Sequence, residues 1–307
     1  MRNLFLLIFI STAFATILIV PSDEYPSIQS GIDAATIGDT VLVSDGIYDE
    51  NLILDKSIIL ASHAIFDDLS EWITDEDDIY FDQWIVANSH IVNTRIRGNN
   101  PDNPDFGSVI LISTEQDECI QPEIIGFTIE GGSGTRVIRE EDNNEYDVTL
   151  GGGILADVSD PLIHFNQFID NGSNEVFSGG GTYSTTEPSD WGFDNRRNSQ
   201  PRCEIDEIRI SDNLYSGNDA MYGNTFSNLY YEGSVDISGS IFDVYDCSDE
   251  QNSVSAVWIQ IESDASVNYT DGAGQLCAFI EPHVYVDSNI EQECLIQSCG
   301  VQDNPFK

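Results

Sequence analysis

Basic residues are scarce in this chain. Its 307 residues include 11 Lys and Arg against 54 Asp and Glu, which gives a formal net charge of −43 at pH 7. A surface this acidic repels the phosphates of nucleic acids and of anionic lipids, so the composition argues against both as partners. Divalent cations are more suitable partners for such an acidic surface. Spread acidity also has a simpler role, because it keeps exported proteins soluble.

Long apolar runs are missing beyond the N-terminus, and no later segment is long enough to span a bilayer. The first fifteen residues combine Arg2, a short apolar run and an A-x-A site at Ala13 and Ala15, which is typical of a secretory signal peptide. The alternative is a membrane anchor, but the apolar run here is shorter than the ~20 residues that an anchor needs to span a bilayer. We therefore predict a signal peptide at residues 1–15 and a secreted or cell-surface protein that does not insert into a membrane after cleavage.

Pairs of the C-x-x-C type are also missing. The four histidines lie far from the cysteines in the sequence, which argues against a structural zinc site. In an exported chain the cysteines instead predict up to three disulfides, whose pairing the sequence leaves open. The six cysteines are Cys119, Cys203, Cys247, Cys277, Cys294 and Cys299.

Short β-rich runs separated by Gly or Asn turns make up most of residues 16–307, which we expect to form one domain. Near the N-terminus they include residues 16–20, 40–43, 52–54 and 57–60. A single short amphipathic helix is expected after Ser27, with Ile28, Ile32 and Ala35 on one face. From residue 108 onward similar runs recur, and several alternate apolar and polar residues.

Two glycine triplets are the clearest internal repeat. Gly151-Gly152-Gly153 and Gly179-Gly180-Gly181 lie 28 residues apart, and each precedes a predicted strand. A repeat of roughly 20 to 30 residues is typical of a β-solenoid, whose first coil needs a cover. The sequence therefore predicts an all-β, right-handed parallel β-helix (a single-stranded β-solenoid) with a short N-terminal capping helix. A β-sandwich is the alternative.

Two segments interrupt the repeats and predict loop insertions. They span residues 67–84, which are acidic and aromatic, and residues 185–202, which are polar. Solenoids commonly place variable binding elements in such loops. Their aromatic side chains are candidates for stacking on sugar rings or, equally, for plugging the loops against the core. These candidates are Trp72, Tyr80, Trp84 and Trp191.

The N-terminal region resembles the opening of pectin-lyase-like right-handed β-helix proteins, which are secreted bacterial proteins built from parallel β-helix repeats. The resemblance rests on YPSIQ at residues 25–29, GDTVLV at 38–43 and DGIYDEN at 45–51. It extends loosely over residues 108–183, through GGGIL at 151–155 and DPLIHFNQF at 160–168. The resemblance implies the fold and often a carbohydrate-facing groove, but the family contains lyases, esterases, hydrolases, epimerases and proteins without known catalysis.

The catalytic patterns of that family are absent. The chain lacks the basic and histidine patterns of pectate lyases and the paired-aspartate signatures of polygalacturonases, as well as the motifs of pectin methylesterases and alginate epimerases. A lyase needs a basic residue near a carboxylate or metal. The best local candidates are Arg196, Arg197 and Arg202, which otherwise form a solvated loop.

Two acidic runs supply oxygen ligands that suit Ca²⁺, although neither has the spacing of a dedicated calcium loop and solvated acid is the simpler interpretation. The candidate ligands are Asp75, Asp77, Asp78, Glu140, Glu141 and Asp142.

We therefore expect a non-catalytic protein that binds carbohydrate or another extracellular polymer on its lateral face. A polysaccharide lyase or glycoside hydrolase with diverged catalytic residues is the alternative, and an adhesive or surface-layer module is a third possibility.

Overall fold

A computed structural model describes residues 15–240 with several gaps, together with four later strands. The gaps are residues 79–80, 99–100, 102, 104, 114–118, 142–143, 158, 186–190, 193–206, 221–225, 232–233 and 237. The later strands cover residues 257–262, 267–268, 278–283 and 295–297. The predicted signal peptide, except for Ala15, and five of the six cysteines lie outside the described residues, so cleavage and disulfide pairing stay predictions.

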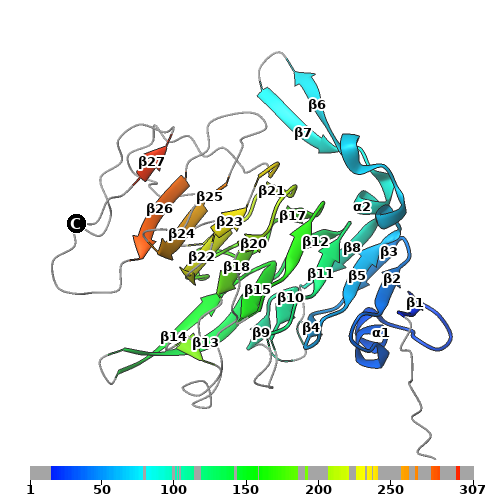
Figure 1. Cartoon of the computed structure of the whole chain (residues 1–307), viewed down its shortest axis with the longest axis horizontal. Coiled ribbons are helices and arrows are strands. Elements are labelled where there is room, and N and C mark those ends of the chain that lie inside the picture. The colour runs from blue at the N-terminus through cyan, green and yellow to red at the C-terminus, as the bar shows by residue number, and fades with distance from the viewer. Residues whose placement is uncertain are drawn as a thin grey trace, which may run out of the picture.

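Three largely parallel sheets dominate the structure, which confirms the all-β class (Figure 1). Sheet A contains β1 (Ile17–Val20), β2 (Thr40–Val43), β5 (Ile59–Ser62), β11 (Glu123–Ile125), β16 (Leu162–His164), β20 (Glu207–Arg209), β23 (Ser234–Asp236) and β25 (Val267–Asn268). Sheet B contains β3 (Gly46–Asp49), β8 (Thr94–Arg97), β12 (Thr128–Glu130), β17 (Gln167–Ile169) and β21 (Leu214–Ser216).

Sheet C contains β4 (Leu52–Leu54), β10 (Ile110–Ile112), β15 (Ile154–Asp157), β18 (Thr182–Thr185), β22 (Phe226–Tyr231), β24 (Val257–Glu262) and β26 (Ala278–His283). It ends with β27 (Leu295–Gln297), which pairs antiparallel with β26.

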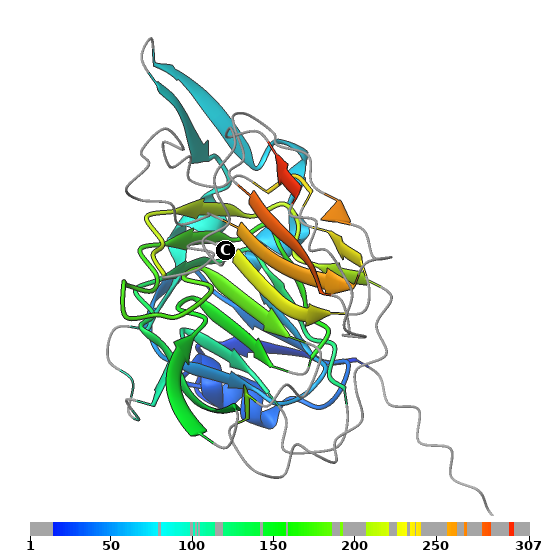
Figure 2. The ribbon, with the colours of Figure 1, turned by 90° about the vertical axis from the view of Figure 1, so that its left-hand side faces the viewer.

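Between β2 and β22 the chain forms one strand in sheet A, one in sheet B and one in sheet C, and this order repeats five times. We call each set of three successive strands a passage. Strands of one passage pair in parallel with those of the next, as β4, β10, β15 and β18 do in sheet C. Figures 1 and 2 show the passages following one another from the blue N-terminal end toward the orange strands. Residues one passage apart in sequence therefore lie side by side.

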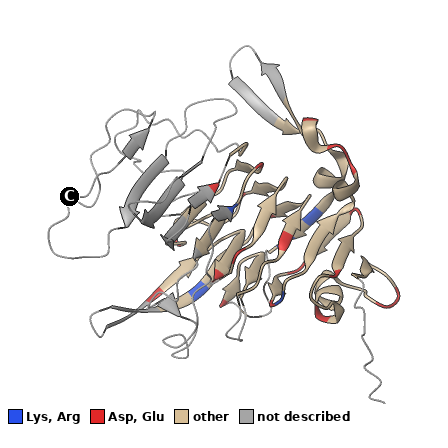
Figure 3. Ribbon diagram, in the orientation of Figure 1, with Lys and Arg blue, Asp and Glu red and all other residues tan. Residues whose placement is uncertain are grey.

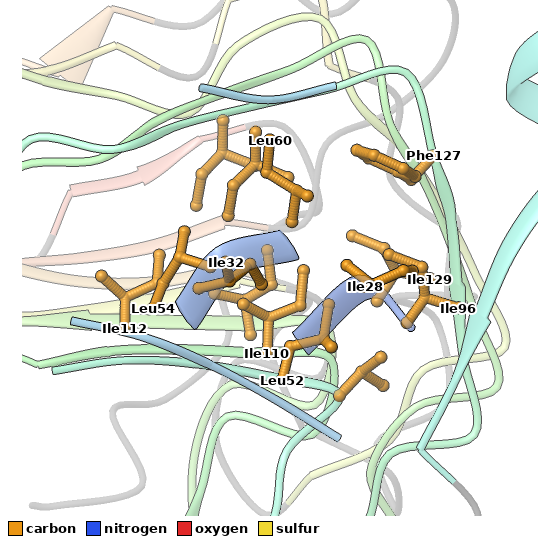
Figure 4. Packing of buried hydrophobic residues seen from close by; sticks show 14 of the residues in the cluster. Ile28, Ile32, Leu52, Leu54, Leu60, Ile96, Ile110, Ile112, Phe127 and Ile129 are labelled. Atoms are coloured by element: carbon orange, nitrogen blue, oxygen red, sulfur yellow. The ribbon is translucent and has the colours of Figure 1, made fainter. Parts of the chain in front are cut away.

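The core lies between the three sheets and is built from apolar side chains in register across passages (Figure 4). On sheet A, Val41 pairs with Leu60, which pairs with Ile124, and all three are fully buried. On sheet B, the rings of Phe168 and Tyr215 are stacked with centroids 4.7 Å apart. Each passage thus buries the apolar side chains of its neighbour.

The predicted helix is α1 (Ile28–Ala34), and it covers the N-terminal end of this core. The Ser27 hydroxyl accepts a hydrogen bond from the Ser30 backbone N–H, and the Ser30 hydroxyl accepts one from the Ser27 backbone N–H, which forms a capping box. Ile28 and Ile32 are fully buried in the core cluster. Within the described residues, no helix combines the length and the apolar character needed to cross a bilayer.

A ladder of buried asparagine side chains lies at the corner between sheets A and B. The Asn166 side-chain oxygen accepts from the Phe127 backbone N–H at 3.0 Å, and the Asn213 side-chain oxygen accepts from the Asn166 N–H at 3.0 Å. The Asn166 amide group in turn donates to the carbonyls of Ile124 and His164. The ladder thus supplies acceptors for the buried N–H groups of these turns, whose carbonyls accept backbone hydrogen bonds from the next passage.

A second ladder lies at the corner between sheets B and C. The Asn171 side-chain oxygen accepts from the Gly132 N–H at 3.0 Å, and the Asn218 side-chain oxygen accepts from the Asn171 N–H at 3.1 Å. The glycine triplets follow this corner. Gly152 and Gly153 donate backbone hydrogen bonds to the carbonyls of Gly179 and Gly180, each 3.0 Å long, so the 28-residue repeat corresponds to adjacent passages.

The insertion expected at residues 67–84 contains a 3-10 helix and most of a β-hairpin, where a loop was predicted. It belongs to a longer excursion between β5 and β8 that contains η1 (His63–Phe66), η2 (Leu69–Glu71), β6 (Ile73–Asp78), β7 (Phe81–Val86) and α2 (Ser89–Asn93). Strands β6 and β7 pair antiparallel over their whole length and project from the sheets (Figure 1). The backbone N–H and C=O groups of β6 and β7 are satisfied by pairing between the two strands. The acidic composition of this segment does not reveal that pairing.

A second hairpin, which the sequence analysis does not predict, connects sheets B and C. It consists of β13 (Gly134–Glu141) and β14 (Asn144–Leu150), and β9 (Phe106–Gly107) and β19 (Trp191–Gly192) pair with β13. Its Val137 and Leu150 pack against Leu155 and Tyr183 on the outward face of sheet C. The hairpin therefore covers the outward face of sheet C over β10, β15 and β18, whereas Ile53 on β4 stays exposed.

Candidate functional site

The outward face of sheet B carries two rows of side chains that run across the passages, because alternate residues of each strand point the same way. The first row is Ile47, Arg95, Thr128, Gln167 and Leu214. The second row, from the other outward positions, is Asp49, Arg97, Glu130, Ile169 and Ser216.

Two arginines and one glutamate form the centre of this face. Glu130 accepts hydrogen bonds from Arg95 through Nε at 3.2 Å and through Nη2, and from Arg97 through Nε at 2.6 Å. The Glu130 side chain is 13% exposed, whereas the two arginine side chains are about one-third exposed. Figure 3 shows a blue segment of β8 beside a red segment of β12, in a ribbon where blue is rare.

The electrostatics of this triad favour an ionised glutamate. Partial burial on its own would raise the pKa of the Glu130 carboxyl, but the hydrogen bonds from Arg95 and Arg97 outweigh it and bring that pKa below its ordinary value. Glu130 thus stays charged and orients both guanidinium groups. Within the described residues, the Nη1 of Arg95 and both terminal amino groups of Arg97 make no hydrogen bond.

We predict that Glu130→Gln destabilises the protein in a pH-dependent way. A carboxyl whose pKa is lower in the folded state contributes stability above its unfolded pKa of about 4.3, and that contribution is lost as pH falls through the folded pKa. The variant should therefore be less stable near pH 7, and the difference should shrink as the pH is lowered below about 4.3, in urea titrations at pH 7 and at an acidic pH at which the protein stays folded. The gap is expected to be modest, because the arginines are partly exposed. An equal loss at both pH values, or the same loss in the exposed control Glu175→Gln, would contradict it.

The excursion between β5 and β8 covers part of the first row. The Thr128 hydroxyl donates to the Ile91 carbonyl of α2 at 2.9 Å, and Leu214 packs with Trp72 and Ile91. The second row stays more open, since Asp49 and Ser216 are exposed. The open part of sheet B is therefore a mostly polar and charged band alongside the excursion, which also contains the apolar side chains of Ile47 and Ile169.

Trp72 is the one predicted stacking residue whose side chain the structure describes. It is 5% exposed, and its ring packs edge-on against Phe165 with centroids 5.8 Å apart. This is the plugging arrangement, because the indole has no open face for a sugar ring. Trp84 lies in β7 opposite Asp75, and Trp191 lies in β19 opposite Arg139. Their side chains, and all of Tyr80, lie outside the described part.

The other predicted site residues are not brought together by the described structure. Arg196, Arg197, Arg202 and Asp142 lie in the gaps. The remaining acidic candidates lie on the two hairpins, with Asp75, Asp77 and Asp78 in β6 and Glu140 and Glu141 in β13. Among the described residues, no cluster of three or more His, Cys, Asp or Glu side chains could hold a metal ion. Calcium binding therefore stays a prediction.

A second titratable cluster lies on the outward face of sheet A. His164 Nε2 is 2.9 Å from a carboxylate oxygen of Glu123, and both side chains are mostly buried. Burial raises the pKa of Asp212 at the next corner, against the opposing effects of a Ser211 hydrogen bond and the nearby His164. Burial likewise raises the pKa of Asp160, although Gln121 donates to it at 2.7 Å. An acid with a raised pKa beside a histidine, as Asp212 is beside His164, is typical of acid–base sites.

The arginines of sheet B are not among the residues predicted from the sequence. The available signal was Arg95 and Arg97 at alternate positions of a short β-rich run, which places both on one face of a strand. Glu130 lies 33 residues after Arg97, so only the pairing of β8 with β12 reveals the triad.

Comparisons with known proteins add no assignment. Searches against protein-family models, curated proteins and solved structures each gave no match to this chain.

Proposed function

We propose that this protein is a secreted right-handed parallel β-helix that binds a carbohydrate or another extracellular polymer along the outward face of sheet B. It does not catalyse a reaction of that polymer. The repeated path through three parallel sheets supports the fold, and so do the asparagine ladders at two corners. Both features are expected when consecutive passages stack along one axis.

The observation that carries the binding proposal is the Arg95–Glu130–Arg97 triad. The planar guanidinium group of arginine can donate several hydrogen bonds to carboxylates and hydroxyls. Here Glu130 fixes the orientation of both guanidinium groups, and terminal amino groups of both arginines have no acceptor among the described residues. Pre-organised donors lose little entropy when a ligand binds. In a chain with so few basic residues, two arginines on one open face are a local exception to the acidic surface.

The geometry of the face suits an extended ligand. Neighbouring strands lie about 4.8 Å apart, so a polymer running across the passages meets a new outward side chain at each strand. Along the second row these side chains include Asp49, Arg97, Glu130 and Ser216, which can all form hydrogen bonds. A polysaccharide that carries hydroxyl and carboxylate groups has matching chemistry. For an acidic polysaccharide, Ca²⁺ would bridge its carboxylates to those of the protein.

We expect Arg97→Gln to weaken retention on the preferred polymer roughly tenfold or more, because a hydrogen bond from a charged donor contributes about 1.5–3 kcal/mol. The measurement is affinity electrophoresis on a panel of uronate and neutral polysaccharides, with and without Ca²⁺. The matched control is Arg136→Gln on β13, where the arginine pairs with Asp147 away from sheet B. Equal retention of Arg97→Gln and the unmodified protein would remove this face as the binding site.

The enzymatic alternative has its own support in the sheet A cluster. His164 paired with Glu123 resembles an oriented general base, and Asp212 with its raised pKa resembles a general acid. The same polymer panel separates the two functions. Unsaturated uronide absorbance would indicate a lyase and new reducing ends a hydrolase, whereas retention without either product supports binding alone.

A further inference from the structure

The carboxylate of Asp39 lies beside the backbone nitrogen of Thr16, the residue that follows the predicted cleavage site. Thr16 N donates to Asp39 Oδ1 at 2.7 Å. The other oxygen, Oδ2, accepts from the backbone N–H and the hydroxyl of Thr36 at 2.8 and 2.7 Å. Asp39 is 6% exposed as a residue, and both of its carboxylate oxygens accept hydrogen bonds from these groups.

Asp39 has no cationic partner in the described structure. None of the ion pairs within the described residues includes it, and all its hydrogen-bond donors are uncharged backbone amides and hydroxyls. A buried carboxylate of this kind is normally paired with a positive charge. These donors hold the pKa of Asp39 below its ordinary value, chiefly through the Thr36 hydroxyl and backbone. The carboxylate is thus ionised and lacks a counter-charge.

We propose that Asp39 is the binding site for the α-ammonium group of Thr16, which is created when the Ala15–Thr16 peptide bond is cleaved. A host endopeptidase would hydrolyse this bond with one water molecule, leaving a carboxylate on Ala15 and an ammonium group on Thr16. The nitrogen that now donates as an amide would then form an ion pair with Asp39 without moving. The inference rests on the secretion part of the proposed function and is independent of polymer binding.

The position of this nitrogen is specific to one cleavage site. The Thr16 carbonyl accepts from the Thr40 N–H at 2.8 Å, so Thr16 is held on both sides of its Cα. One additional residue before Thr16 would move the ammonium group up to about 3.3–3.6 Å away. Ala15 and Thr16 are both exposed, which leaves the bond between them accessible to a protease.

The ion pair would fasten the end of the fold. Strand β1 is the terminal strand of sheet A, and its Val20 lies against Gly31 of the capping helix. Terminal strands fray easily unless they are tied down. An ammonium–carboxylate pair at the residue before β1 would therefore stabilise the terminal strand and the helix together, only in the processed protein.

The test compares two purified proteins, one beginning at Thr16 and one carrying a single glycine before Thr16, which restores the amide at this nitrogen. Charge-assisted hydrogen bonds are about twice as strong as neutral ones, so the unfolding equilibrium constant of the Thr16 form should be roughly tenfold smaller. Asp39→Asn in both backgrounds should abolish that difference. Intact-mass analysis of the full chain after export should show Thr16 as the first residue.

A different first residue, or equal stability of the two forms with Asp39 present, would overturn the proposal. The glycine extension leaves Asp39 unchanged, so the comparison stands even if Asp39→Asn fails to fold. Polymer retention measured on the same two proteins separates the outcomes. If both proteins are retained on the polymer but are equally stable, the ammonium site alone is rejected. If the Thr16 form is more stable but neither protein is retained on any polymer, only the binding function is rejected.

Discussion

Replacement of Gly152 by alanine is expected to destabilise the protein by at least about 3 kcal/mol, above the usual range for an overpacked site. A Cβ atom on Gly152 would lie less than 3.0 Å from the Gly180 carbonyl oxygen and from the backbone N and Cα of Gly172. All three atoms belong to the backbone of the next passage, so no side chain can rotate away. The passages would have to separate, which breaks the hydrogen bonds between the triplets.

Gly38→Ala is the matched control for this prediction. Gly38 has φ +86°, and a Cβ atom there would meet nothing within 4 Å, so the variant incurs only backbone strain of about 1–2 kcal/mol. Urea denaturation followed by circular dichroism gives both free energies of unfolding. If Gly152→Ala costs no more than Gly38→Ala, the close stacking of the triplets is wrong.

Asn166→Ala is expected to cost about 3–4 kcal/mol. Asn166 is fully buried, and its side chain accepts from the Phe127 N–H and donates to the carbonyls of Ile124 and His164. Alanine removes these interactions and a further one with the Asn213 side-chain oxygen, and leaves a buried N–H without an acceptor, which alone costs about 1–3 kcal/mol. The lost volume adds a cavity between two passages. Urea denaturation measures the change directly.

Asn88→Ala provides the comparison for an asparagine that serves one passage only. Asn88 caps α2, where its side chain accepts from the N–H groups of His90 and Ile91, and such a cap contributes about 1 kcal/mol. Asn166→Ala should be clearly the more damaging of the two. Equal costs would show that the ladder does not hold the passages together.

Local patterns predicted the elements of the N-terminal region well. The capping helix and the strands near residues 17–20, 40–43 and 52–54 were confirmed, because their signals are an N-cap, a 3.6-residue period and short β-branched runs. The two hairpins were not predicted. Strands β6 and β13 are rich in acidic residues, which have low β propensity, so their stability comes from pairing with β7 and β14.

The candidate site was predicted less well than the fold. Trp72 was predicted either to stack on sugar rings or, equally, to plug its loop against the core, and its packing against Phe165 in a corner turn of another passage is the second arrangement. The arginines that form the open triad were overlooked in favour of the basic run at residues 196–202, because clustering in sequence is visible and clustering in space is not. A strand exposes alternate residues, so isolated basic residues on neighbouring strands form a patch that no local window detects.

The sequence by itself determined most strands of the N-terminal region, where the capping helix begins and the 28-residue spacing of the two glycine triplets. These properties depend on residues close together in the chain. Only the tertiary structure decided that Arg97 meets Glu130, that Asn166 meets Asn213 and that Thr16 meets Asp39. Such contacts depend on the register between passages, and connections of very different length separate those passages, so no sequence period specifies the register.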